Sequence, residues 1–169
     1  MGVTPLGAGF RLSAAEARAC ALPSSSRVLR PFLTGRDLCS QASGESIIDF
    51  FGLAEEKARA ENPELFQRLL NTVYPVRCTD KRAAYRTRWW IFAEPRPSMR
   101  AALASLRRYI ATVQVSKHRF FVFVETHVLP DHGLFAVASD DAYYLGVLSS
   151  TIHGKWALAT SGTLEDRPY

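Results

Sequence analysis

Hydrophobic and polar positions follow two periods along this chain of 169 residues, and the two periods predict both strands and helices. Short apolar runs predict strands at residues 28–33, 46–51, 109–113, 120–124 and 134–138. Helical periods occupy residues 13–20, 54–60, 62–75, 99–106, 141–150 and 152–159. Because strands and helices follow each other in irregular order, the pattern predicts the α+β class, with a mixed, largely antiparallel sheet packed with four to five helices in a single domain.

Turn and capping residues define several element ends. Ser13 and Glu16 have the spacing of a capping box at the start of a helix. Asn62 is expected to cap the next long helix, with Pro63 as its first residue. The polar stretch Thr34–Asp37 contains Gly35 and is predicted to be a turn.

The helix predicted over residues 141–150 follows two polar residues that favour a helix start. Ser139 or Asp140 is expected to cap it, and capping also accounts for the neighbouring pair of carboxylates at Asp140 and Asp141. The side chains expected to face the core are Tyr144, Leu145, Val147 and Leu148. A second helical segment then leads into a polar loop at residues 160–167.

Charge is distributed unevenly along the chain, whose net charge is +5. From Arg77 to Arg119 there are eleven Lys and Arg residues against two acids, whereas the remainder has ten against fourteen. A basic middle in an acidic frame predicts one positive face suited to a polyanion such as nucleic acid. An acidic protein surface and a membrane surface are the alternative partners of such a face.

The adjacent residues Trp89 and Trp90 have two interpretations. Their indole rings could stack on nucleic-acid bases, because Arg86 and Arg88 lie beside them. Adjacent tryptophans more often contribute large apolar surfaces to a core, and we favour that interpretation.

Motifs of catalysis are missing from the sequence. It has no glycine-rich phosphate loop and no GxSxG, and its three cysteines and four histidines lack zinc-ligand spacing. No apolar run approaches the 18 residues of a membrane span. We therefore expect no catalytic residue, cofactor site or metal site in this chain, and no membrane partner.

Binding chemistry is better supplied. Lys117, His118 and Arg119 form a basic entry to a strand and are expected to contact phosphate groups. In the loop at residues 160–167, Arg167 could bind the two acceptors of guanine, and Glu165 could accept a hydrogen bond from cytosine. An ordinary surface ion pair between Glu165 and Arg167 is the alternative.

Several blocks resemble the target-recognition domain of MmeI-like enzymes, the single-chain restriction–modification proteins of types IIG and IIL. The matching blocks keep their order and are residues 7–12 (GAGFRL), 29–38 (LRPFLTGRDL), 48–53 (IDFFGL), 85–90 (YRTRWW), 116–121 (SKHRFF) and 139–156. The resemblance covers nearly the whole chain, so we expect residues 1–169 to be a single DNA target-recognition domain and a piece of a longer polypeptide.

The resemblance implies the remaining functional expectations. In that family one bacterial, cytoplasmic polypeptide joins an endonuclease segment, an N6-adenine DNA methyltransferase that uses S-adenosylmethionine, and this domain. The family's methyltransferase motifs do not occur here, and Asn62-Pro63-Glu64-Leu65 departs from its Asn-Pro-Pro-Tyr box. The partners implied are double-stranded DNA and the methyltransferase domain of the same chain, which would flip out and methylate the target adenine.

Residues and resemblance together give a set of candidate DNA-binding positions. The set is Arg30, Arg36, Arg86, Arg88, Lys117, His118, Arg119, Ser150, His153, Lys155, Thr163, Glu165 and Arg167. The alternative hypothesis is a non-catalytic protein-interaction or scaffold domain whose basic face meets an acidic partner. A stand-alone enzyme is the third and least favoured interpretation.

Overall fold

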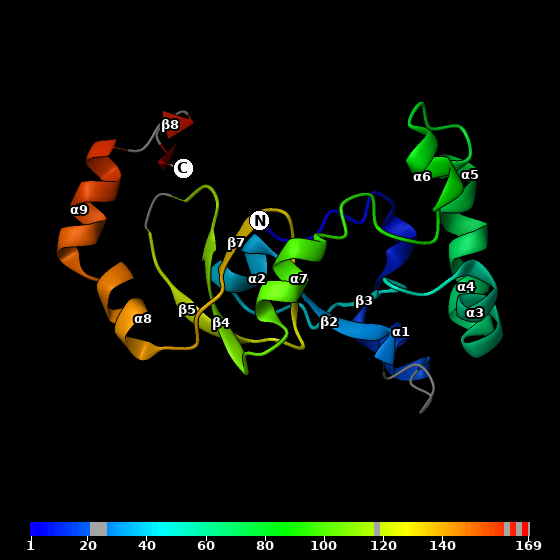
Figure 1. Cartoon of the computed structure of the whole chain (residues 1–169), viewed down its shortest axis with the longest axis horizontal. Helices are drawn as coiled ribbons and strands as arrows, with labels where there is room; N and C mark the ends of the chain where they lie inside the picture. Colours follow the sequence, from blue (N-terminus) through cyan, green and yellow to red (C-terminus); the bar gives the residue numbers. More distant parts are fainter. Residues whose placement is uncertain (21–26, 117–118, 161–162, 165–166, 169) are drawn as a thin grey trace. The chain divides into compact units, whose positions relative to one another are not determined.

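The computed structural model describes residues 1–20, 27–116, 119–160, 163–164 and 167–168. It divides into two compact units, which are described separately (Figure 1). The helical unit comprises Val3–Phe32 and Ser43–Pro95, and the sheet unit comprises Met1–Gly2, Leu33–Ala42 and Arg96–Tyr169. Helices and antiparallel strands alternate irregularly in both units, which confirms the predicted α+β class.

Among its described residues, the helical unit contains three short strands and five helices. Strand β3 (Ser46–Ile48) pairs antiparallel with β1 (Arg11–Leu12) and with β2 (Leu29–Leu33). Its helices are α1 (Ala14–Ala19), α3 (Glu55–Glu61), α4 (Pro63–Thr72), α5 (Tyr74–Arg77) and α6 (Ala83–Thr87), with a 3-10 turn η1 at Ala8–Phe10. The predicted strand at 46–51 ends early because the Asp49 carboxylate accepts a hydrogen bond from the Phe51 N–H, which turns the chain.

Aromatic packing forms the core of the helical unit. The predicted apolar stripe of α4 is buried at Leu65, Phe66 and Leu69, and the Phe66 ring lies 5.2 Å from the Trp89 ring. Both tryptophans are buried, and the Trp90 indole N–H donates to the Leu53 carbonyl at 3.1 Å. The core interpretation of Trp89 and Trp90 is therefore confirmed, because both side chains are buried.

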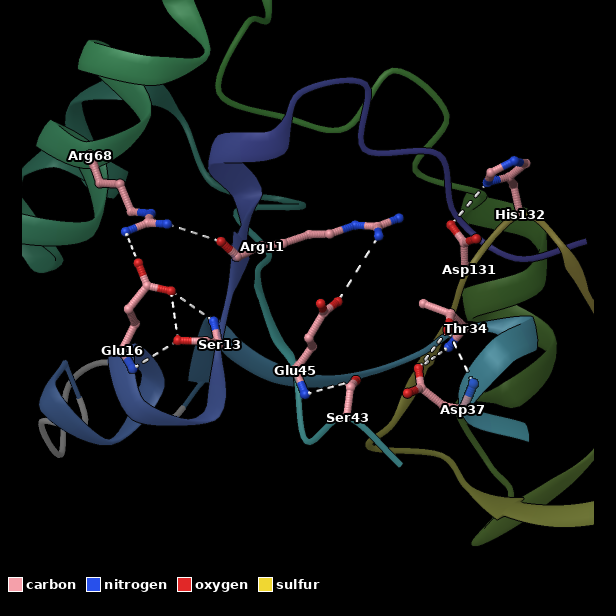
Figure 2. Close-up of polar contacts among 10 residues, drawn as sticks. All are labelled: Arg11, Ser13, Glu16, Thr34, Asp37, Ser43, Glu45, Arg68, Asp131 and His132. Atoms are coloured by element: carbon pink, nitrogen blue, oxygen red, sulfur yellow. Dashed lines mark hydrogen bonds and ion pairs between the residues drawn. The ribbon is translucent and has the colours of Figure 1, made fainter. Parts of the chain in front are cut away.

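The predicted capping box at the start of α1 is confirmed. The Ser13 hydroxyl accepts a hydrogen bond from the Glu16 N–H at 3.3 Å, and the Glu16 carboxylate accepts from the Ser13 N–H at 2.8 Å (Figure 2). Arg68 of α4 donates to the same carboxylate at 2.9 Å. These hydrogen bonds, with that from the Ser13 backbone as the largest cause, lower the pKa of Glu16 to about 2.

The sheet unit is built around β4 (Arg108–Val113). Strand β4 pairs antiparallel with β5 (Val122–Glu125) on one side and with β7 (Leu134–Val137) on the other. Helix α7 (Pro97–Leu103) packs Met99 and Leu103 into a cluster with Tyr109 and Ala111, so the predicted amphipathic helix is also confirmed. The remaining elements of the unit are α2 (Gly35–Cys39), β6 (Leu129–Pro130), α8 (Ala142–Leu148), α9 (Thr151–Thr160), β8 (Thr163–Leu164) and β9 (Arg167–Pro168).

Two local predictions are corrected by hydrogen bonds at helix starts. Thr34–Asp37 is not a turn, because Thr34 and Asp37 form a capping box that starts α2 (Figure 2). The cap of α8 is Asp141 rather than Ser139 or Asp140, since the Asp141 carboxylate accepts from the Tyr143 N–H at 2.8 Å.

The predicted inward face of α8 is wrong in part. Tyr144 and Val147 are exposed, Leu145 and Leu148 are only half-buried, and α8 has no buried residue. Helix α9 also has no buried residue. Both helices are rich in apolar residues, yet most of their large apolar side chains remain exposed among the described residues.

Candidate nucleic-acid interface

In the sheet unit, Arg119 precedes β5 and is committed in part to the backbone. Its side chain is half-buried, and an Nη1–H donates to the Val113 carbonyl at the end of β4, at 2.9 Å. Lys117 and His118 lie outside the described residues. Arg119 thus fixes the connection between two neighbouring strands in addition to any role in phosphate contact.

The structure brings Ser150 and His153 together at the start of α9. The Ser150 hydroxyl accepts a hydrogen bond from the His153 N–H at 3.1 Å and so caps the helix. His153 Nδ1 lies 2.7 Å from the Leu148 carbonyl, which can only accept, so Nδ1 carries the proton. When the ring is neutral, its acceptor is therefore Nε2.

Two aromatic rings lie near the imidazole of His153. The ring of Phe121 lies 5.6 Å from the imidazole, and that of Trp156 lies 6.1 Å from it. Trp156 is exposed, as is the neighbouring Lys155. This surface joins one ammonium group to an accessible indole, a pairing that suits phosphate contact with adjacent stacking. Sequence analysis selected His153 and Lys155 but did not select Phe121 or Trp156.

In the helical unit, residues 78–88, the basic segment before the tryptophans, are mostly exposed. Arg86 of α6 folds back on the segment before the helix, with Nη1 donating to the carbonyls of Asp80 at 2.6 Å and Lys81 at 3.1 Å. Arg88 is exposed and is one of the residues that line a cavity of about 440 Å³. Arg30 forms an ion pair with the buried carboxylate of Asp49 at 3.7 Å.

The remaining candidates are distributed over separate elements. Arg36 is exposed on α2. The predicted polar loop includes an antiparallel pair, in which Thr163 is opposite Pro168 and Arg167 is opposite Leu164. Glu165 lies outside the described residues. Backbone pairing thus places Thr163 and Arg167 on adjoining strands, where the sequence predicted only a loop.

Several arginines that sequence analysis did not select contact aromatic rings, among them Arg108 and Arg82. The Arg108 guanidinium lies 3.7 Å from the centre of the Phe123 ring and donates to the Asp140 carbonyl. Arg82 stacks 5.0 Å from the centre of the Tyr85 ring. Arg82 and Tyr85 are three residues apart on a helical turn, so that contact had a local signal in the sequence, whereas Arg108 and Phe123 meet only through strand pairing.

The described residues contain neither a group of metal ligands nor a membrane-spanning helix. In that part of the chain, no three His, Cys, Asp or Glu side chains are grouped in a way that could hold a metal ion. None of the helices that the structure describes is both long enough and apolar enough to cross a membrane.

Comparison with known proteins gives a likeness in fold. No family model matches the chain, and no curated protein matches it. Among solved structures, the chain is similar to the Type IIL restriction-modification enzyme MmeI in complex with DNA, with a TM-score of 0.79 and 21% identity. The match covers 99% of this chain but 23% of that one, so the chain spans about a quarter of the length of MmeI. The two proteins share this fold.

Proposed function

We propose that the chain is the DNA target-recognition domain of a restriction–modification enzyme. In this role it selects a sequence and positions duplex DNA, so that an N6-adenine methyltransferase domain using S-adenosylmethionine can flip and methylate a base. The observation that carries the proposal is the likeness in fold, over 99% of the chain, to part of an enzyme solved in complex with DNA.

Exposed basic side chains support contact with the phosphate backbone. Arg36, Arg86, Arg88 and Lys155 are all exposed, and they lie on α2, α6, the segment after α6, and α9. Phosphate contacts position a protein on a duplex but carry no sequence information, so a second group of residues has to read the bases. We assign base reading to the segment of β8 and β9, where Arg167 and Glu165 have the donors and acceptors that guanine and cytosine require.

Fluorescence anisotropy with random duplex DNA, titrated over about 20 to 200 mM salt, tests the proposal. A multi-phosphate footprint is expected to give a steep linear fall of log affinity with log salt, because bound phosphates release counterions. Site selection on the same chain should then yield a preferred sequence, and Arg167→Ala should change the preference at one base pair. Absence of duplex binding at the lowest salt, both here and in a chain joined to its methyltransferase domain, would overturn the proposal.

A second candidate function, protein docking, is favoured by the exposed apolar residues of α8 and α9. Six large apolar side chains are exposed there, namely Tyr143, Tyr144, Val147, Ile152, Trp156 and Leu158. Lys155 is the only charged residue between Ala142 and Thr160. Exposed apolar patches of this kind mark protein contacts. As the main activity, this candidate predicts no measurable duplex affinity at any salt concentration.

A further inference from the structure

The helical unit contains a cavity to which the proposed function gives no role beyond a phosphate contact by Arg88. We propose that it is a binding site for a single unstacked nucleotide, whose base enters the apolar cavity while its phosphate binds Arg88. The inference rests on the proposed function in one respect, namely that the nucleotide would belong to the bound DNA. The site itself is argued from the walls, the room and the charge of the cavity.

Four aromatic side chains are among the residues that line the cavity. Phe51 comes from the loop before α3, Tyr85 from α6, and Trp90 and Phe92 from the segment that follows α6. Flat π-faces stack on any nucleobase, and base–aromatic stacking does not depend on sequence. Segments far apart in the chain thus bring together side chains suited to one planar ring.

Contacts behind the walls hold two of these rings in place. The Tyr85 ring centre lies 5.3 Å from the guanidinium of Arg77 and 5.0 Å from that of Arg82, and its hydroxyl accepts a hydrogen bond from Arg82 at 2.6 Å. The Trp90 indole is fixed by its hydrogen bond to the Leu53 carbonyl. A site with walls fixed in this way needs little ordering when a ligand enters, which favours binding.

The cavity has room for a base. Its volume is about 440 Å³, within the range usual for small-molecule sites. Gly52 is among the lining residues and has a φ of +84°, a conformation that favours glycine. A Cβ built on Gly52 meets nothing within 4 Å, so the lining there is open. Ala54, Ala84 and Ala93 supply further small side chains to the lining.

The positive charge of Arg88 favours a ligand that carries a negative charge. Arg88 is exposed and forms no ion pair with the residues that the structure describes, and no acidic side chain is among the described residues that line the cavity. A guanidinium binds phosphate through two parallel hydrogen bonds. An apolar aromatic cavity with one exposed arginine among its described lining residues therefore fits a planar base that carries a phosphate.

Titration followed by ¹H–¹⁵N NMR tests the site, with the Trp90 indole cross-peak as reporter. The probes are deoxyadenosine monophosphate, deoxyadenosine and inorganic phosphate, each added to the whole chain. The monophosphate is expected to shift this peak saturably, deoxyadenosine to bind about tenfold more weakly, and inorganic phosphate to leave the peak in place. Absence of a saturable shift with the monophosphate would overturn the proposal, and so would an equal response to inorganic phosphate.

Two variants and a control separate the cavity from general basic charge. Arg88→Gln is expected to weaken binding of the monophosphate about tenfold and to leave deoxyadenosine unchanged. Ala84→Leu should weaken both ligands by filling the cavity. Arg18→Gln removes an exposed arginine from α1 of the same unit and should change neither. Equal effects of Arg88→Gln and Arg18→Gln, or no effect of Ala84→Leu, would contradict the site.

Duplex binding is measured on the same proteins, which separates this inference from the proposed function. Duplex binding without any response to the monophosphate would overturn the nucleotide site alone. A saturable response to the monophosphate without duplex binding would instead contradict the role in DNA recognition. A shift produced by an acidic dipeptide but not by the nucleotide would reassign the cavity to a protein partner.

Discussion

Arg77 is a fully buried arginine whose partners are mainly backbone carbonyls. Its Nε–H donates to Leu6 at 2.9 Å, and its Nη2 group donates to Pro5 at 2.6 Å and to Ile91 at 3.3 Å. Burial lowers the pKa of Arg77, but a guanidinium keeps its charge in proteins. One side chain therefore satisfies carbonyl groups in two segments of the helical unit that are far apart in sequence.

Replacing Arg77 should destabilise the helical unit strongly. Arg77→Met leaves buried carbonyls without donors, each at a cost of about 1–3 kcal/mol, so the free energy of unfolding should fall by at least about 2 kcal/mol. Arg77→Lys keeps the charge but loses the planar fork of donors, and it should recover only part of that loss. Urea unfolding followed by tryptophan fluorescence measures both variants. Equal stability of Arg77→Lys and the parent would contradict this account.

Glu16 gives the stability of the chain a dependence on pH. Its pKa is lowered from 4.5 to about 2 in the folded state, so its contribution is fully present above pH 4.5. That contribution is lost as the pH falls through about 2. Glu16→Gln should be less stable than the parent at neutral pH, and the two stabilities should converge near pH 2. Urea unfolding at a series of pH values checks this, with Glu56→Gln in α3 as the matched control.

Single residues show which contacts a sequence can predict. Ser13 and Glu16 are three positions apart, so their capping box was predicted correctly from spacing alone. The role of Arg77 could not be predicted, because the carbonyls of Leu6 and Pro5 lie 71 and 72 positions away. In the sequence, Arg77 is the first residue of the basic region 77–119, although its side chain is buried in the structure.

At the scale of elements, α4 and α9 show how differently an apolar helix can be used. Leu69 of α4 is 0% exposed, whereas Leu158 of α9 is 58% exposed. Leu69→Ala should lower the free energy of unfolding by about 2–5 kcal/mol, since it opens a cavity in the core. Leu158→Ala should change it by less than about 0.5 kcal/mol. Urea unfolding of this matched pair tests the assignment, and a large loss for Leu158→Ala would show that α9 is covered in solution.

The same contrast explains which elements the sequence predicted. The strands at 109–113 and 134–138 were found because a short apolar run bounded by polar residues is a local signal. The inward face of α8 was wrong because an apolar pattern does not say whether another element covers it. The start of α2 was missed because a five-residue helix differs from a turn only in the capping box of Thr34 and Asp37.

At the scale of the whole molecule, counting charges overstates the basic surface. Eleven Lys and Arg residues lie between Arg77 and Arg119. Arg77, Arg86 and Arg119, however, donate to backbone carbonyls, which occupies part of their hydrogen-bonding capacity. The candidate interface was predictable as a basic region, but the availability of each cation depends on folded contacts. The salt dependence of duplex binding should therefore reflect fewer phosphates than the number of basic residues.

Lys155 and Lys57 offer a matched test of that argument. Lys155 is exposed beside Trp156, whereas Lys57 on α3 forms an ion pair with Glu61 at 3.7 Å. If Lys155 contacts one phosphate, Lys155→Gln should make the slope of log affinity against log salt shallower by about 0.9. Lys57→Gln removes the same charge and should leave the slope unchanged. Equal slopes for the two variants would mean that Lys155 acts only through net charge, because the net charge changes identically in both.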